Sequence, residues 1–67
     1  MAIIEKNKKL ENNYKTMTRK DIIKLYNNNL NELCIARDYC YEKSKEYMDL
    51  MYWELYTKLE NIIDDFA

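Results

Sequence analysis

The sequence predicts an all-α protein, an antiparallel helical hairpin that dimerises into a four-helix bundle, and three observations support the helical class. The 67 residues contain neither glycine nor proline, so tight β-turns lack the residue they favour and no residue breaks a helix outright. Leu, Lys, Glu, Met and Arg, which favour helices, together supply much of the chain. Apolar residues also recur at alternating spacings of three and four, which is typical of helices with one buried face.

Residues 1–17 are expected to form a basic N-terminal arm or a short helix. Ile3, Leu10, Tyr14 and Met17 follow a loose heptad spacing, but asparagines and lysines interrupt it. The pattern leaves both alternatives open.

A helix is predicted to begin just after Thr18. The hydroxyl of Thr18 can accept a hydrogen bond from a free backbone N–H, and Asp21 three residues later can return the bond to Thr18. Met17 can pack on Ile22 across this start as a hydrophobic staple. The remaining residues, 18–67, are therefore expected to form the helical hairpin.

The first helix of the hairpin is predicted over about residues 18–43. The asparagines at 27–29 offer a rival break, because Asn tolerates the left-handed conformation and Asn29 with Glu32 could begin a new helix. The apolar stripe nevertheless keeps its phase through Tyr26 and Leu30. We therefore expect the asparagines to lie on the solvated face of one continuous helix.

The second helix is predicted over about residues 45–66. Its apolar series is out of phase with the first by one residue, so the chain either continues through a stutter or reverses direction; the series is Met48, Tyr52, Leu55, Leu59, Ile62 and Phe66. A reversal near residues 43–45 is favoured, because residues 42–46 are strongly polar and Ser44 is a suitable N-cap.

Charge supports the same reversal. Residues 1–24 hold seven Lys and Arg against three Asp and Glu, whereas residues 25–67 hold four against nine. A hairpin brings the basic start of the first helix beside the acidic end of the second, which favours this orientation. The expected neighbours are Arg19, Lys20 and Lys24 on one side and Glu60, Asp64 and Asp65 on the other.

The hairpin carries more large apolar side chains than its seam can bury. The surplus residues fall outside the helical stripes and are expected to gather near the turn; they are Ile35, Tyr39, Tyr47, Leu50 and Trp53. An apolar cluster rich in Tyr and Trp is typical of a binding surface. Arg37 joins this predicted partner-binding set, with Glu46, Asp49 or Glu54 as its expected ion-pair partner.

Two helices cannot bury a core alone, so we expect a second copy to supply another layer. The competing explanation for the surplus residues is that they pack inside that homodimer and bind no other protein.

The residue inventory argues against catalysis. The chain has no histidine for a Ser-His or Cys-His pair and no glycine for a phosphate-binding loop. Cys34 and Cys40 lack metal-binding spacing and, on one helix, lie too far apart for a disulfide. Paired carboxylates such as Asp64 and Asp65 are better explained as a solvated helix face. We expect no enzyme activity, cofactor, metal or small-molecule substrate.

Nucleic-acid binding is the alternative function. Seven cations between residues 6 and 24 could follow a phosphate backbone: Lys6, Lys8, Lys9, Lys15, Arg19, Lys20 and Lys24. The acidic remainder of the chain and the pI near 5.4 argue against this role.

The expected function is therefore a binding task, as an adaptor, inhibitor or regulatory protein. No run approaches 18 apolar residues, and no signal-peptide core is evident, so we expect a cytoplasmic location without a membrane partner. Small size and a composition rich in Asn, Lys, Ile and Tyr also suggest a phage or mobile-element protein directed at a host or defence protein.

Overall fold

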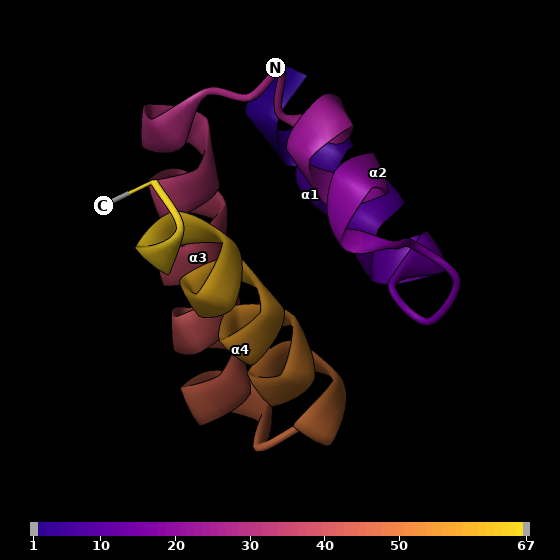
Figure 1. The fold of residues 1–67 in the computed structure, drawn as a ribbon. Coiled ribbons are helices and arrows are strands. Elements are labelled where there is room, and N and C mark those ends of the chain that lie inside the picture. Colours follow the sequence, from indigo (N-terminus) through magenta and orange to yellow (C-terminus); the bar gives the residue numbers. More distant parts are fainter. Residues whose placement is uncertain (1, 67) are drawn as a thin grey trace.

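The computed structural model describes the backbone of residues 2–66 and the side chains of residues 4–66. Over this range the chain is helical with no strand, which confirms the all-α class (Figure 1). The four helices are α1 (Ala2–Asn13), α2 (Arg19–Leu25), α3 (Leu30–Tyr47) and α4 (Leu50–Asp64).

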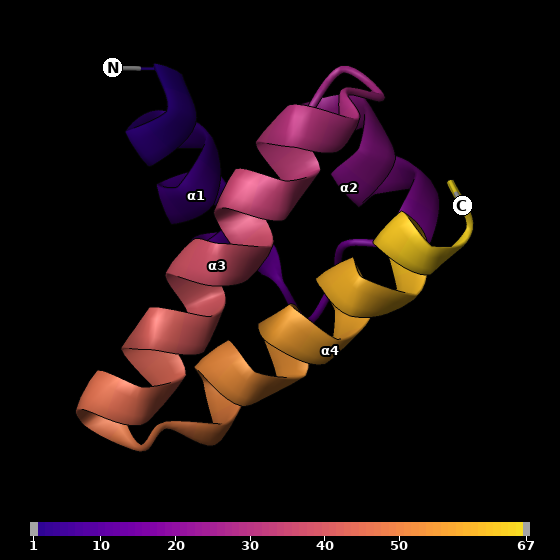
Figure 2. The ribbon, with the colours of Figure 1, turned by 90° about the vertical axis from the view of Figure 1, so that its left-hand side faces the viewer.

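The helices pack as two layers. The chain reverses after α3, and α4 runs back beside it, while α1 and α2 both lie on one side of this pair (Figures 1 and 2). Helix α1 contacts both α3 and α4, and α2 contacts α4. The N-terminal third of the chain therefore covers one face of the α3–α4 pair.

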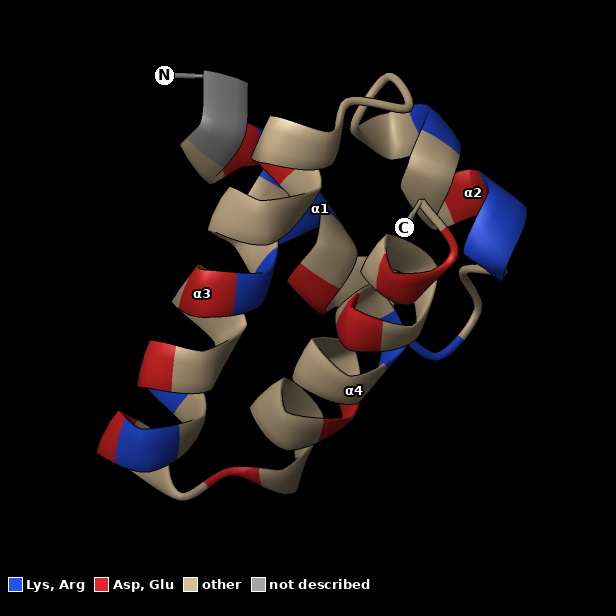
Figure 3. Ribbon diagram, turned by 60° about the vertical axis from the view of Figure 1, so that its left-hand side comes forward, with Lys and Arg blue, Asp and Glu red and all other residues tan. Residues whose placement is uncertain are grey.

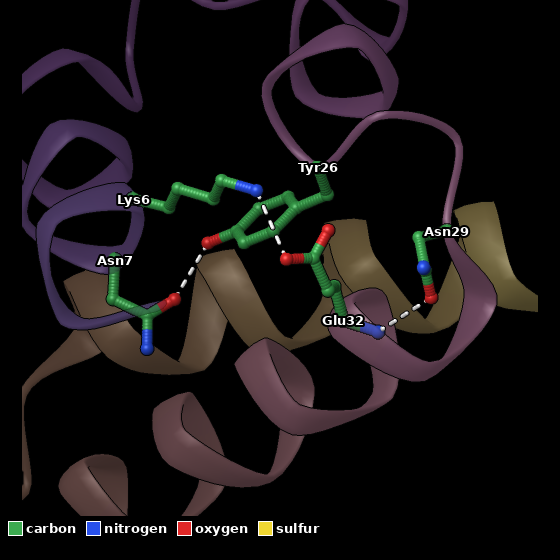
Figure 4. A network of polar contacts seen from close by, with 5 residues as sticks. All are labelled: Lys6, Asn7, Tyr26, Asn29 and Glu32. Atoms are coloured by element: carbon green, nitrogen blue, oxygen red, sulfur yellow. Dashed lines mark hydrogen bonds and ion pairs between the residues drawn. The ribbon is translucent and has the colours of Figure 1, made fainter. Parts of the chain in front are cut away.

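The sequence left open whether residues 1–17 form an arm or a short helix, and the structure has helix α1 in this segment. Leu10 is fully buried against the other helices. Lys6 donates to Glu32 of α3 at 2.9 Å, and the hydroxyl of Tyr26 donates to Asn7 at 2.6 Å (Figure 4). Asn7 is itself buried, so this bond satisfies a polar group that would otherwise be costly to bury.

The predicted start of a helix after Thr18 is confirmed. The Thr18 hydroxyl accepts from the N–H of Asp21 at 3.2 Å, and the carboxylate of Asp21 accepts from the N–H of Thr18 at 3.0 Å. Interaction with Thr18, chiefly the hydrogen bond donated by its backbone N–H and secondarily its side chain, holds the pKa of Asp21 below its ordinary value.

The prediction of one continuous helix over 18–43 is wrong. Asn27 and Asn28 have positive φ angles of 55° and 54°, and Asn29 caps α3 by accepting from the N–H of Glu32 at 3.2 Å. Tyr26, the last residue before this turn, is fully buried. The apolar stripe kept its phase because Tyr26 and the start of α3 contribute to the same core, and phase alone does not reveal a turn made of residues that tolerate the left-handed conformation.

The predicted turn near residues 43–45 is also wrong. Ser44 lies inside α3 and donates to the carbonyl of Tyr41 at 2.7 Å instead of capping a helix. The reversal comes at Met48, which has left-handed angles of φ 51° and ψ 40°, and Asp49 then caps α4 by accepting from the N–H of Met51 at 2.9 Å. Residues 42–46, the polar segment that suggested a turn, form the solvated C-terminal part of α3.

The core is closed by the chain's own two layers. Leu10, Ile22 and Tyr26 come from the N-terminal layer and pack against buried residues of α3 and α4. The buried apolar partners on those two helices are Leu33, Ala36, Cys40, Leu55, Leu59 and Ile62. The additional layer that we expected from a second copy is thus supplied within the chain.

Candidate protein-binding surface

An apolar surface lies on α3 and α4 around the turn that joins them, and we call it the aromatic face. It consists of Tyr41, Met48, Leu50, Trp53 and Tyr56. Met48 is 89%, Leu50 75% and Trp53 50% exposed, fractions that are high for large apolar side chains. The residues of this face come from α3, from α4 and from the turn between them, whose course Figure 2 shows.

Three aromatic rings form a row across the two helices. The ring centroids of Tyr41 and Tyr56 are 5.3 Å apart with planes at 42°, and those of Trp53 and Tyr56 are 5.3 Å apart at 33°. Such tilted contacts are favourable and fix the orientation of the rings. The ammonium of Lys45 lies 4.6 Å from the centroid of Tyr41. The row is therefore a preformed surface.

Two shallow clefts flank this row. The first, of about 450 Å³, lies at the turn and is lined by Ser44, Lys45, Met48, Asp49, Leu50 and Trp53. The second, of about 380 Å³, is lined by Arg37, Asp38, Tyr41, Tyr56 and Glu60. All of these residues belong to α3, α4 or the turn between them. Trp53 lines the first cleft and Tyr41 and Tyr56 line the second, so the row of rings connects the two.

Arg37 lines the second cleft and has partners other than those predicted. It donates to Glu60 at 3.0 Å and to Asp38 at 3.3 Å. Partial burial works against its charge, but the hydrogen bonds from Arg37 to these carboxylates raise the pKa of the guanidinium. Glu46, Asp49 and Glu54 were expected because the turn was placed too early; the later turn brings Glu60 level with Arg37.

The other predicted partner-binding residues divide between several places. Leu50 and Trp53 lie in the aromatic face. Tyr47 is 57% exposed, with its ring 6.1 Å from that of Tyr52. Ile35 is exposed on α3, about three turns before Tyr47. Tyr39 is partly buried against the core, so its predicted place off the seam was wrong.

Tyr41, Met48 and Tyr56 were missed by the sequence analysis. Met48 was assigned to the buried seam, yet it is the most exposed large apolar residue of the described chain. Asp49 is a good N-cap residue. Had the sequence analysis placed the end of the first helix at Met48 and the cap of the second at Asp49, it would have brought all three residues together.

Tyr39 and Tyr52 instead flank a buried carboxylate on the opposite side of the α3–α4 pair. Oε1 of Glu11 on α1 is buried and makes no hydrogen bond within the described residues. Desolvation, together with the nearby charge of Glu11, raises the pKa of Tyr39 and of Tyr52 to about 12. Desolvation likewise raises the pKa of the Cys40 thiol to about 12. Both cysteines are free thiols, and Cys40 lacks the lowered pKa of a nucleophile.

The predicted cations also divide into two groups. Arg19 pairs with Asp65, one of its expected neighbours, whereas Glu60 pairs with Arg37 and not with Lys20 or Lys24. Lys6 pairs with Glu32, a contact that the charge pattern did not predict. Lys9, Lys20 and Lys24 line clefts on the N-terminal layer, and Lys8 and Lys15 are exposed. Figure 3 shows these basic residues on α1, on α2 and between them.

Within residues 2–66, no three residues of the His, Cys, Asp and Glu types converge as a metal site. None of the helices described is long and apolar enough to cross a membrane. Compared with protein families, curated proteins and solved structures, the chain matches none.

Proposed function

We propose that this chain is a non-enzymatic protein-binding module, acting as an adaptor, inhibitor or regulatory protein through its aromatic face. The observation that carries the proposal is the exposure of Met48, Leu50 and Trp53 beside a core that the chain has already closed. These side chains contribute little to folding where they lie, whereas burying them against a partner is favourable at about 25 cal/mol per Å².

The composition of the face supports this role. Tyr, Trp and Met are enriched in protein interfaces, and Trp and Tyr carry much of the binding energy there. Arg37 and Glu60 at one end and Asp49 at the other supply polar groups around the apolar centre. An apolar centre with a polar rim is the usual anatomy of such a surface.

The partner that best suits the aromatic face and its two clefts is an amphipathic helix of another protein. From Arg37 in one cleft to Met48 in the other, this strip of α3 spans about 17 Å, which equals roughly three helical turns. A helix laid along it would place apolar residues at spacings of three and four against the row formed by Tyr41, Tyr56 and Trp53.

A second copy of the chain is the competing occupant. The four-helix bundle that we expected depended on an uncovered hairpin, and α1 and α2 now cover one face of α3 and α4. The aromatic face offers self-association an exposed apolar surface on the side of α3 and α4 that α1 and α2 leave open. Light scattering across concentration measures it directly.

The test compares partner capture from cells of origin by the wild type, by L50A/W53A and by I35A. Ile35 is 49% exposed and lies outside both clefts, so I35A is a control matched to Trp53 in exposure. We expect the wild type and I35A to retain the same partner and L50A/W53A to lose it, with unchanged helical circular dichroism.

Identical capture by all three proteins would overturn the proposal. A concentration-dependent dimer that only L50A/W53A dissociates, with no partner captured, would assign the face to a second copy.

A further inference from the structure

A separate basic surface lies on the opposite layer of the molecule, over α1 and α2. One cleft of about 440 Å³ lies between these helices and is lined by Lys9 and Lys24 together with Asn13 and Thr16. A second, of about 640 Å³, is lined by Lys20 and Lys24 with Asn27 and Asn28. Because Lys24 and Asp21 belong to both clefts, the two form one continuous surface, which we call the basic face.

The lysines of the basic face are available to a ligand. Lys9, Lys20 and Lys24 form no ion pair with another described residue, in contrast to Lys6 and Arg19. Lys20 and Lys24 are four residues apart on α2, so their side chains leave the same side of the helix. Three cations from two helices, none of them in an ion pair with a described residue, thus line this surface.

Asp21 is the only acidic residue among those lining the two clefts. Its carboxylate already accepts a hydrogen bond from the N–H of Thr18 in the capping box. It therefore offsets the three lysines only in part. The amides of Asn27 and Asn28 add hydrogen-bond donors where the left-handed turn exposes them.

The net charge of the chain does not oppose an anion at this surface. The negative charge belongs to residues 25–67, most of which form the α3–α4 layer. The molecule measures 28 × 24 × 23 Å, whereas charges are screened over about 8 Å at physiological ionic strength. Asp65 after the end of α4 does reach α2, but there it pairs with Arg19, so a polyanion approaching the three lysines encounters chiefly the local positive charge.

We propose that the basic face binds the phosphate backbone of a nucleic acid. Exposed lysines and amides are phosphate contacts that position a strand without reading its sequence. Repeated phosphates on one strand can engage Lys9, Lys20 and Lys24 together, which a single free phosphate cannot do. This inference does not depend on the aromatic face.

Three phosphate contacts set the expected salt dependence. For a single strand the slope of log affinity against log salt is about −0.7 per contact, so three contacts predict about −2. Affinity for a single-stranded DNA oligonucleotide of mixed sequence should therefore fall about 20-fold between about 50 and about 200 mM salt.

Fluorescence anisotropy with that oligonucleotide tests the proposal, with the corresponding duplex as a second arm. K9Q/K24Q removes one cation from each helix, and K43Q/K45Q removes two from α3 and gives the same net charge. We expect K9Q/K24Q to weaken binding and to reduce the slope by about 1.4, and K43Q/K45Q to retain both.

Equal weakening by the two variants, or wild-type binding that salt does not reduce, would overturn the proposal. Binding to acidic phosphatidylserine vesicles without binding to either oligonucleotide would overturn it in favour of a lipid surface. Partner capture through the aromatic face should be the same for K9Q/K24Q and the wild type, so failure of one proposal is separable from failure of the other.

Discussion

At the scale of single residues, short polar side chains decide where helices begin. Thr18, Asn29 and Asp49 each accept a hydrogen bond from a backbone N–H in the first turn of the following helix. These N–H groups have no partner within their own helix, so the caps replace bonds that water would otherwise make. In a chain without glycine or proline, such caps divide the sequence into helices.

The capping box of α2 makes stability depend on pH. Because the folded pKa of Asp21 is lowered, its contribution is fully present above the ordinary value and is lost as the pH falls through the folded value. We expect T18A to cost about 1 kcal/mol at neutral pH, and D21N to flatten the acid side of the stability profile. Urea denaturation at a series of pH values measures both effects.

The control for this pH profile is E42Q, which removes an exposed carboxylate from α3. It should keep the wild-type slope. A D21N profile as steep as that of the wild type would show that Asp21 does not contribute in this way.

At the scale of elements, the turn between α3 and α4 sets the contents of the aromatic face. Moving the reversal from residues 43–45 to Met48 brings Tyr41 against Tyr56 and Arg37 against Glu60. Each residue added to α3 turns the facing side chains by about 100°. The position of this turn therefore determines which side chains are exposed.

Met48 combines a strained backbone with an exposed side chain. A left-handed conformation costs a residue with a Cβ about 1–2 kcal/mol, and the 89% exposure of Met48 means that little packing offsets it. We expect M48G to raise the free energy of unfolding by about 1 kcal/mol while weakening partner capture.

The contrast is E46G, two residues earlier inside α3, which should destabilise by about 1 kcal/mol. Thermal unfolding compares the two variants. If both variants were less stable than the wild type, replacing Met48 with glycine would relieve no backbone strain, and the prediction would be wrong.

At the scale of the whole molecule, the N-terminal layer completes the fold. Helix α1 supplies Leu10 to the core, and polar bonds from Lys6 and Asn7 join it to Glu32 and Tyr26. A single chain of this size has a small core, so losing one layer removes a large share of the buried surface. The fold should therefore respond strongly to changes in α1.

Replacing Leu10 tests the contribution of α1. L10A leaves a cavity in the core and should cost about 2–5 kcal/mol, against a total stability of roughly 3–10 kcal/mol for a chain of this length. I4A, on the same helix but 57% exposed, should change stability by less than about 0.5 kcal/mol. Chemical denaturation gives both values, and equal effects would exclude α1 from the cooperative core.

Two of the five residues of the aromatic face, Leu50 and Trp53, were predictable from the sequence because they lie outside the apolar stripe. Arg37, beside the face, was identified because a cation interrupts the stripe, and both signals are visible without coordinates. Tyr41, Met48 and Tyr56 were not, because their exposure depends on a turn displaced by a few residues. Tyr39 was misassigned because the residue that covers it, Glu11, is far away in the sequence.

The sequence alone determined the helical class and the capping box at Thr18, because composition, apolar period and caps act within a few residues of the chain. Only the tertiary structure decided that the asparagines break a helix and that residues 2–26 cover α3 and α4. Several turns were locally acceptable, and packing selected among them, because burying Leu10 and Tyr26 against distant residues outweighs the small local differences.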